Sequence, residues 1–139
     1  MTPSAASYIY DDNNNFGGLA KDKAFVILGD LNADAIDGNA IKTGIQRLTH
    51  HPRIIDPKPS SDGGKMHRKD NPNAQHHTAF WGMRADYVLP AKAQLNVLDA
   101  GIFWPQVNEP EFRLVKDRAA SSDHRLVWVD LTFKNSPSK

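Results

Sequence analysis

Short apolar runs, each with a polar motif at one end, constrain the fold of this chain most strongly. The run 24–28 leads into GDLN (29–32), the run 125–133 follows SSDH (121–124), and RADY (84–87) begins a third apolar segment. Runs of this length between turn-forming residues are typical of buried strands. The sequence therefore predicts an α/β domain in which carboxylates, an amide and an imidazole lie at strand ends.

Length and charge limit the class of protein. With 139 residues, 40% of them hydrophobic and 24% charged, the chain is long enough for one globular domain and too short for two. No apolar run approaches the ~20 residues that a membrane span needs. A net charge of +1 argues against a broad basic surface for nucleic acid, although it allows a local phosphate site. We expect a flexible start (1–7), a folded unit (8–133) and a polar tail (134–139).

The remaining pattern predicts one helix, one long loop and several strands. Apolar residues recur at three- and four-residue steps from 37 to 50, which indicates an amphipathic helix capped by Asp37 or Asn39. Segment 56–78 is polar and rich in Gly, Pro, Asn, Lys and His, so we expect a long loop there. The expected strands lie at 24–28, 86–89, 94–97, 101–104 and 125–133.

The motifs place polar groups where hydrolysis of a phosphodiester could use them. Asp30 and Asn32 are two positions apart, so an extended chain would direct both side chains to one side. GDLN is equally consistent with a simple turn, because Gly, Asp and Asn are common turn formers. Asp86 lies in an otherwise apolar strand, where a carboxylate needs a partner. His124 is the natural partner, since a carboxylate on one ring nitrogen fixes the tautomer and favours the protonated ring.

In this order and spacing, the three motifs resemble those of the endonuclease/exonuclease/phosphatase superfamily, the group of exonuclease III, DNase I, neutral sphingomyelinases and inositol polyphosphate 5-phosphatases. The resemblance covers nearly all of residues 8–133. It implies the C-terminal half of a DNase I-like four-layer α/β sandwich, with a mostly antiparallel mixed sheet and a flanking helix. Segments 8–34, 103–105 and 123–131 are also similar to large bacterial members, many of them exported. An unrelated β-rich binding domain would require all three motifs to occur in order by chance.

The resemblance also implies a role for each motif residue. Asp30 would orient or deprotonate the attacking water, and Asn32 would hold the phosphate or the metal. Asp123 would be a metal ligand, joined by Asp30 and Asn32 around Mg²⁺, Mn²⁺ or Ca²⁺, which prefer oxygen ligands. His124 would donate a hydrogen bond to the scissile phosphate, and Asp86 would orient His124. The implied attack is in line, with no covalent intermediate.

By resemblance, we expect divalent-metal-dependent hydrolysis of phosphodiesters or phosphate esters, with nucleic acid (DNA or RNA) as the leading substrate class, although the same core residues serve phospholipids and phosphoinositides within the superfamily. Trp81 is a candidate substrate contact, because it lies five residues before Asp86 and can form a wall of the site. The adjacent histidine pairs at 50–51 and 76–77, with His67, are expected to be solvated loop residues. Neighbours on an extended loop point apart, so each pair offers one metal ligand at most.

One part of the superfamily pattern is missing from the sequence. By resemblance, the first half of the domain brings an Asn and a metal-binding Glu on early strands, whereas Glu occurs here only at 109 and 111. A C-terminal half alone would leave the apolar face of its sheet uncovered. This predicts a homodimer, or pairing with a missing N-terminal half. The alternative function is a catalytically silent half-domain that self-associates or binds that missing half.

Overall fold

The computed structural model describes residues 8–20 and 22–134 of the chain. The expected flexible start (1–7) lies outside the described residues, as does the expected tail apart from Lys134. Within the described part, no helix is both long and apolar enough to cross a membrane.

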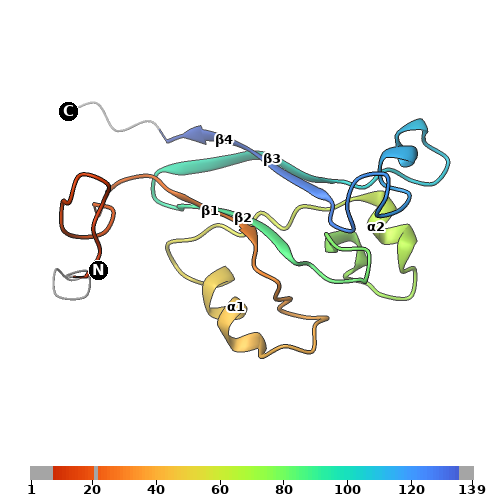
Figure 1. The fold of residues 1–139 in the computed structure, drawn as a ribbon, viewed down its shortest axis with the longest axis horizontal. Helices are drawn as coiled ribbons and strands as arrows, with labels where there is room; N and C mark the ends of the chain where they lie inside the picture. The colour runs from red at the N-terminus through yellow and green to blue at the C-terminus, as the bar shows by residue number, and fades with distance from the viewer. Residues whose placement is uncertain (1–7, 21, 135–139) are drawn as a thin grey trace.

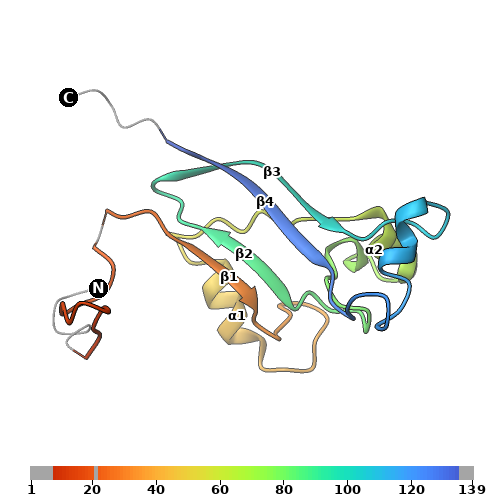
Figure 2. The same cartoon turned by 45° about the horizontal axis from the view of Figure 1, so that its top comes forward.

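In the described residues, four antiparallel-paired strands form two small sheets. One sheet pairs β1 (Val26–Asp30) with β2 (Asp86–Pro90), and the other pairs β3 (Leu95–Phe103) with β4 (Leu126–Phe133). β4 lies beside β2, so the two sheets are neighbours (Figures 1 and 2). Together with the helices, this arrangement confirms the predicted α/β class.

The helices occupy two places. α1 (Lys42–Thr49) lies against one face of β1 and β2 (Figure 1). α2 (Asp62–His67) and the short 3₁₀ helices η2 (Ala74–His76) and η3 (Pro110–Leu114) gather at the end of the sheets where β2 and β4 begin (Figure 1). Polar strand ends and short helices therefore meet at the same end of the molecule.

The hydrophobic core beneath α1 fixes which side chains of β2 face the other way. Tyr87 and Leu89 are buried in a cluster with Ile45 of α1. Because successive strand side chains point to opposite faces, Asp86 projects from the face that α1 does not cover. Asp30 is the register partner of Asp86, so the two carboxylates lie opposite each other on neighbouring strands.

A second core joins α2 to the end of β3. Ile102, Trp104 and Val115 form a buried cluster there. Gly63 of α2 donates its N–H to the carbonyl oxygen of Trp104 at 3.1 Å. A Cβ atom at Gly63 would lie 2.1 Å from that oxygen, so no larger residue fits without moving backbone.

Gly63→Ala is expected to lower the free energy of unfolding by about 1–3 kcal/mol, because the clash is with main chain and forces the cluster apart. Gly44→Ala in α1 is the matched control, since nothing lies within 4 Å of the new Cβ. That change should raise the free energy of unfolding by about 0.5–1 kcal/mol. Urea denaturation measures both, and a harmless Gly63→Ala would contradict the close packing of α2 on Trp104.

Several sequence predictions of element bounds are wrong. The helix expected over 37–50 begins only at Lys42, after the N-cap Ile41, and neither Asp37 nor Asn39 caps it. The carboxylate of Asp34 accepts hydrogen bonds from the N–H groups of Ile36 and Asp37, which holds this stretch in a turn. These hydrogen bonds to Asp34 therefore keep the residues before Lys42 out of the helix, although their apolar spacing is helical.

Two further corrections concern loops and strands. The segment 56–78, expected to be a loop, contains α2 and η2, and the hydroxyl of Ser61 caps α2 by accepting the N–H of Gly64 at 3.2 Å. The strands expected at 94–97 and 101–104 are one continuous strand, β3, with a register irregularity between Val97 and Asp99. The strands expected at 86–89 and 125–133 are confirmed within one residue as β2 and β4.

Candidate active site

Asp86 and His124 form a hydrogen-bonded pair at the start of β2 and just before β4. The Nδ1 atom of His124 lies 2.9 Å from Oδ2 of Asp86. A carboxylate at Nδ1 means that this nitrogen donates a hydrogen, which directs Nε2 away from Asp86. Nε2 faces Asp30, whose Oδ2 is 4.0 Å away. The partnership predicted between Asp86 and His124 is therefore present, and Asp30 is brought to the same place.

Thr78 holds Asp86 in position, and the sequence interpretation did not identify it. Its buried hydroxyl donates to Oδ2 of Asp86 at 2.7 Å and accepts the N–H groups of Ala85 and Asp86. Oδ2 of Asp86 thus contacts both the hydroxyl of Thr78 and the imidazole of His124. The only sequence signal for this role is the position of Thr78 shortly before RADY, and that signal is too weak to predict it.

The backbone after Asp30 forms a turn, so the expectation of an extended chain through Asn32 is wrong. β1 ends at Asp30, and Asn32 has φ 48°, a left-handed conformation that asparagine tolerates. The N–H of Asn32 donates to Oδ1 of Asp30 at 2.8 Å. This bond occupies one oxygen of Asp30, and the other oxygen remains directed toward His124. GDLN is consequently a turn that also delivers a carboxylate to the site.

Asp123 directly precedes His124 in the sequence, but its carboxylate contacts Arg118. Its carboxylate lies 3.5 Å from the guanidinium of Arg118, while Asp30, Asp86 and His124 bring one ligand atom each within 4.8 Å of one another. Among the described residues, Asp123 does not belong to that group of potential metal ligands. The predicted ligand set of Asp30, Asn32 and Asp123 stays a prediction.

Trp81 does lie next to the predicted site. Its ring meets the His124 ring edge-on, with 4.9 Å between ring centroids. The neighbouring backbone fixes this position, because the N–H of Phe80 donates to the carbonyl oxygen of Asp123 at 2.9 Å. The placement agrees with the expectation that Trp81 walls the site, and its contact with substrate stays a prediction.

A family model described as the Endonuclease/Exonuclease/phosphatase family matches residues 1–124 of the chain. The chain belongs to this family. Searches of curated proteins and of solved structures gave no match. Membership supports a metal-dependent, phosphoesterase-type hydrolase at a coarse level, and the match includes all three motifs. The resemblance stated from GDLN, RADY and SSDH is thereby confirmed.

A second polar cluster, formed by Asp34, Asp37 and His77, lies on the α1 side of β2. Nε2 of His77 is 2.8 Å from Oδ2 of Asp37, and both residues lie close to Asp34. His77 is 1% exposed, so the expectation that it is a solvated loop residue is wrong. The carboxylate of Asp34 accepts three main-chain N–H groups, those of Ile36, Asp37 and Arg84. Its oxygens are thus already used to fix the backbone.

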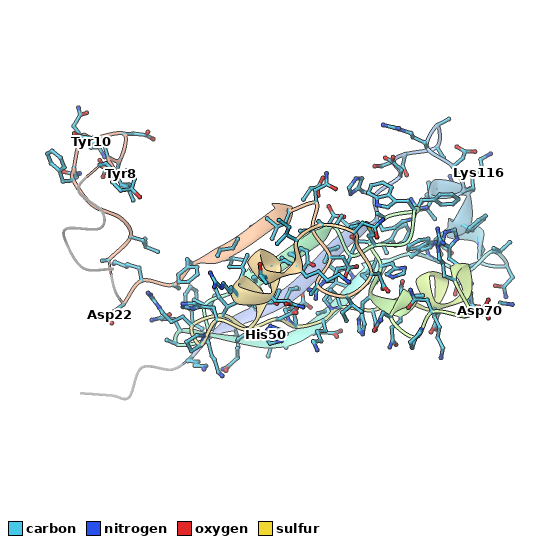
Figure 3. The ribbon with its side chains drawn as sticks, turned by 90° about the horizontal axis from the view of Figure 1, so that it is seen from below. Tyr8, Tyr10, Asp22, His50, Asp70 and Lys116 are labelled. Atoms are coloured by element: carbon cyan, nitrogen blue, oxygen red, sulfur yellow. The ribbon has the colours of Figure 1, made fainter. Side chains whose placement is uncertain are left out.

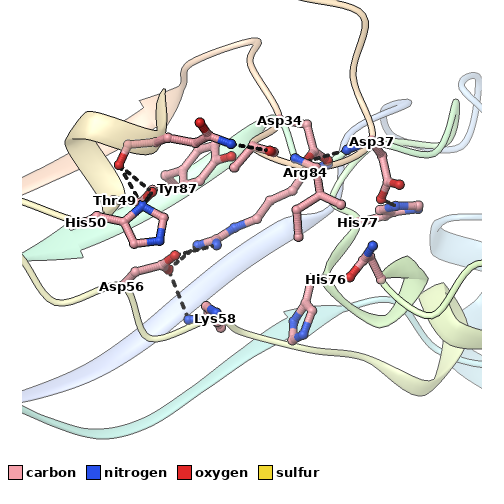
Figure 4. Close-up of a pocket in the computed structure, with 14 residues that line it drawn as sticks. Asp34, Asp37, Thr49, His50, Asp56, Lys58, His76, His77, Arg84 and Tyr87 are labelled. Carbon is pink, nitrogen blue, oxygen red and sulfur yellow. Dashed lines mark hydrogen bonds and ion pairs between the residues drawn. The ribbon is translucent and has the colours of Figure 1, made fainter. Parts of the chain in front are cut away.

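The same side of β2 carries a pocket of about 490 Å³ between α1 and η2 (Figure 4). Arg84 crosses it and donates to both carboxylate oxygens of Asp56, at 2.9 and 2.6 Å. The Arg84 guanidinium also lies over the ring of Tyr87, 4.2 Å from its centroid. Because the carboxylates that line this pocket are bonded to the protein's own donors, we interpret it as support for β2 rather than as the hydrolytic site.

The Asp37–His77 pair makes stability depend on pH. Burial raises the pKa of Asp37, but hydrogen bonds from His77, Asn71 and Asn73 outweigh it and hold the pKa below its ordinary value of 3.8. A lowered pKa in the folded state stabilises the fold above the ordinary pKa, and that stability is lost as pH falls through the folded value. Asp37→Asn should therefore flatten the fall in unfolding free energy below pH 3.8. Urea melts across that range would contradict this if both proteins lost stability equally.

Proposed function

We propose that this chain hydrolyses phosphodiesters with the help of a divalent cation, and that nucleic acid is its leading substrate class. The observation that carries the proposal is the convergence of Asp30, Asp86 and His124 at one end of the sheets. Family membership supports the coarser statement that the chain is of a hydrolytic, metal-dependent class. The substrate class and the individual roles are the proposed part.

Each residue has a chemical task in this proposal. Asp86 holds Nδ1 of His124, so that Nε2 can donate a hydrogen bond to a non-bridging oxygen of the scissile phosphate. Asp30 accepts a proton from the water that attacks phosphorus in line with the leaving oxygen. The side-chain amide of Asn32 holds the phosphate. The P–O bond to the leaving group breaks as the bond to the water oxygen forms, so no covalent enzyme intermediate is needed.

The donor set fits a hard divalent cation such as Mg²⁺, or Mn²⁺ or Ca²⁺ in its place. Among the described residues, no backbone N–H donates to Oδ2 of Asp30, and the Asp30 side chain is accessible to solvent. Asp123 can join it when its long, exposed contact to Arg118 is exchanged. Oxygen ligands of this kind are those that Mg²⁺ prefers. A bound divalent cation supplies charge stabilisation for the phosphate and lowers the pKa of water.

The test is hydrolysis of bis(p-nitrophenyl) phosphate and of plasmid DNA with Mg²⁺ or Mn²⁺, with and without a chelator. We expect activity that the chelator removes and that Asp123→Ala lowers at least about tenfold, because a ligand is lost. Asp70→Ala, an exposed carboxylate elsewhere on the chain, is the matched control and should keep the wild-type rate. Activity that persists in chelator, or that Asp123→Ala leaves unchanged, would contradict the proposal.

A second candidate function is favoured by the exposed apolar side chains beside the site. Leu28 is 69% and Leu126 is 67% exposed, and Trp128 on β4 is exposed as well. Side chains two positions apart along a strand point the same way. Leu28 and Asp30 therefore lie on the same face of β1, and Leu126 and Trp128 lie on the same face of β4. A silent half-domain would use these exposed side chains to pair with a second copy or with an N-terminal half of the domain. In the first case the chain alone would be a dimer, and in both cases it would be inactive by itself. A monodisperse 15.5 kDa species in light scattering counts against self-pairing.

A further inference from the structure

A second pocket adjoins the candidate site. It encloses about 320 Å³, which falls within the range of small-ligand pockets. Two residues connect it to the site, because Trp81 contacts the His124 ring and Asp123 directly precedes His124. A substrate whose phosphate lies at His124 would therefore have this pocket beside it.

Two aromatic residues line the pocket, and both are accessible. Phe80 is 49% and Trp81 is 40% exposed. Their backbone is nevertheless fixed, because Arg68 donates to the carbonyl oxygen of Trp81 and His67 is bonded to that of Phe80, each at 2.8 Å. Each ring packs on one histidine, Phe80 on His67 and Trp81 on His124, and keeps part of its surface exposed on a hydrogen-bonded backbone. Partly exposed aromatic rings of this kind can stack with a base.

The lining of the pocket also carries positive charge. Lys116 and Arg118 line the pocket, and their carboxylate contacts are long, 3.9 Å to Asp117 and 3.5 Å to Asp123. Arg118 is 82% exposed, so its guanidinium can move to an arriving anion at little cost.

Arg125 adds a buried cation to the lining. It is 4% exposed and donates to the main-chain carbonyl oxygens of Ser122 and Val115. Among the ion pairs of residues 8–20 and 22–134, none includes Arg125. The pocket therefore has three cationic residues against the carboxylates of Asp117 and Asp123, and it favours an anionic ligand.

We propose that this pocket binds the nucleotide next to the scissile phosphate, with its base stacked on Trp81 and Phe80 and its outer phosphate bound by Lys116 and Arg118. The inference rests on the proposed hydrolysis of nucleic acid at His124 and assigns the residues that select this substrate. Aromatic rings beside cations fit a base joined to a phosphate, whereas a bare inositol phosphate or lipid headgroup has no aromatic face to stack.

The test is the affinity of the full chain for a fluorescein-labelled hexathymidylate, measured by anisotropy in chelator at several salt concentrations. Trp81→Ala should raise the Kd about 5- to 150-fold, which corresponds to the loss of one stacked base. Arg118→Ala should reduce the slope of log affinity against log salt by about 0.7. Because Arg118 is exposed, this second variant remains informative even if Trp81→Ala fails to fold.

Matched controls lie outside the pocket. Tyr10→Ala removes an exposed ring at the opposite end of the molecule from Lys116 (Figure 3). Arg113→Ala removes an exposed guanidinium of η3 that does not line the pocket. Both should keep the wild-type affinity and salt slope. Losses equal to those of the pocket variants would overturn the proposal, because binding would then be non-specific.

Two further measurements distinguish failure of the nucleotide subsite from failure of the proposed hydrolytic function. Bis(p-nitrophenyl) phosphate carries no nucleotide, so its hydrolysis tests the proposed function alone. If it is hydrolysed while Trp81→Ala and Arg118→Ala bind hexathymidylate like the wild type, the nucleotide subsite is overturned and the hydrolytic function stands. Binding to phosphatidylinositol bisphosphate vesicles that needs Arg118 but not Trp81, with no affinity for hexathymidylate, would also overturn it. Pocket-dependent binding without hydrolysis supports the subsite and contradicts the function.

Discussion

His124→Ala is expected to slow the hydrolysis of bis(p-nitrophenyl) phosphate by about 10²- to 10³-fold, the usual effect of removing one hydrogen-bond donor to developing charge. The structure gives the reason. Asp86 holds Nδ1 at 2.9 Å, and the opposite nitrogen faces the open end of the sheets beside Asp30. Alanine removes that donor, while the Thr78 hydroxyl still donates to Asp86. Initial rates with Mg²⁺ or Mn²⁺ measure the effect.

His51→Ala is the matched control for this variant. His51 is exposed just after α1, and its replacement should leave the rate within about twofold, as expected for a surface change away from the site. Far-ultraviolet circular dichroism of both variants checks that each is folded. Equal rates for His124→Ala and His51→Ala would show that His124 takes no part in the reaction.

Arg84→Met is expected to lower the free energy of unfolding by about 3–5 kcal/mol, because it leaves the nearly buried Asp56 carboxylate without its partner. Methionine keeps much of the packing on Tyr87, so the loss reports the missing charge rather than a cavity. Burial raises the pKa of Asp56, yet the hydrogen bonds and charge of Arg84 hold that pKa below its ordinary range. Urea denaturation near neutral pH, where Asp56 is ionised, measures the loss.

Two controls separate the ion pair from general packing. The double variant Asp56→Leu with Arg84→Met should regain most of the lost stability, since replacing a whole buried pair by apolar side chains is close to neutral. Lys116→Ala breaks an exposed pair with Asp117 and should change the unfolding free energy by less than about 1 kcal/mol. If the double variant were as unstable as Arg84→Met alone, packing rather than charge would explain the loss.

The sequence predicted those parts of the fold that depend on local pattern. β2 and β4 are apolar runs with clear ends, and both occur where expected. Asp86 and His124 could be paired because a carboxylate within such a run needs a partner and few candidates exist. The sequence therefore predicted the α/β class, the family and the central hydrogen bond of the site.

Long-range contacts determine what the sequence pattern missed. The start of α1 depends on Asp34, whose carboxylate also receives the N–H of Arg84, fifty positions away. The burial of His77 depends on Asp37, and α2 depends on the close approach of Gly63 to Trp104. Periodicity carries no information on these pairs, because each is formed only after distant segments pack together.

The site shows the same division on a smaller scale. The order of the motifs was enough to predict that Asp30, Asp86 and His124 converge, since strand ends carry them to one edge. It was insufficient to predict the turn at Asn32, which depends on the Asp30 carboxylate accepting its N–H. The contact of Asp123 with Arg118 and the support of Asp86 by Thr78 were likewise invisible, because side-chain direction in loops follows tertiary packing.

The central claim is that Asp86 and His124 act as one catalytic unit, and a double-mutant cycle on hydrolysis rates tests it most directly. Rates with bis(p-nitrophenyl) phosphate are compared for the wild type, Asp86→Asn, His124→Ala and the double variant. We predict that the double variant is no slower than His124→Ala, since residues that act as a unit give strongly non-additive losses. Losses that multiply, or a wild-type rate equal to that of the double variant, would contradict the claim.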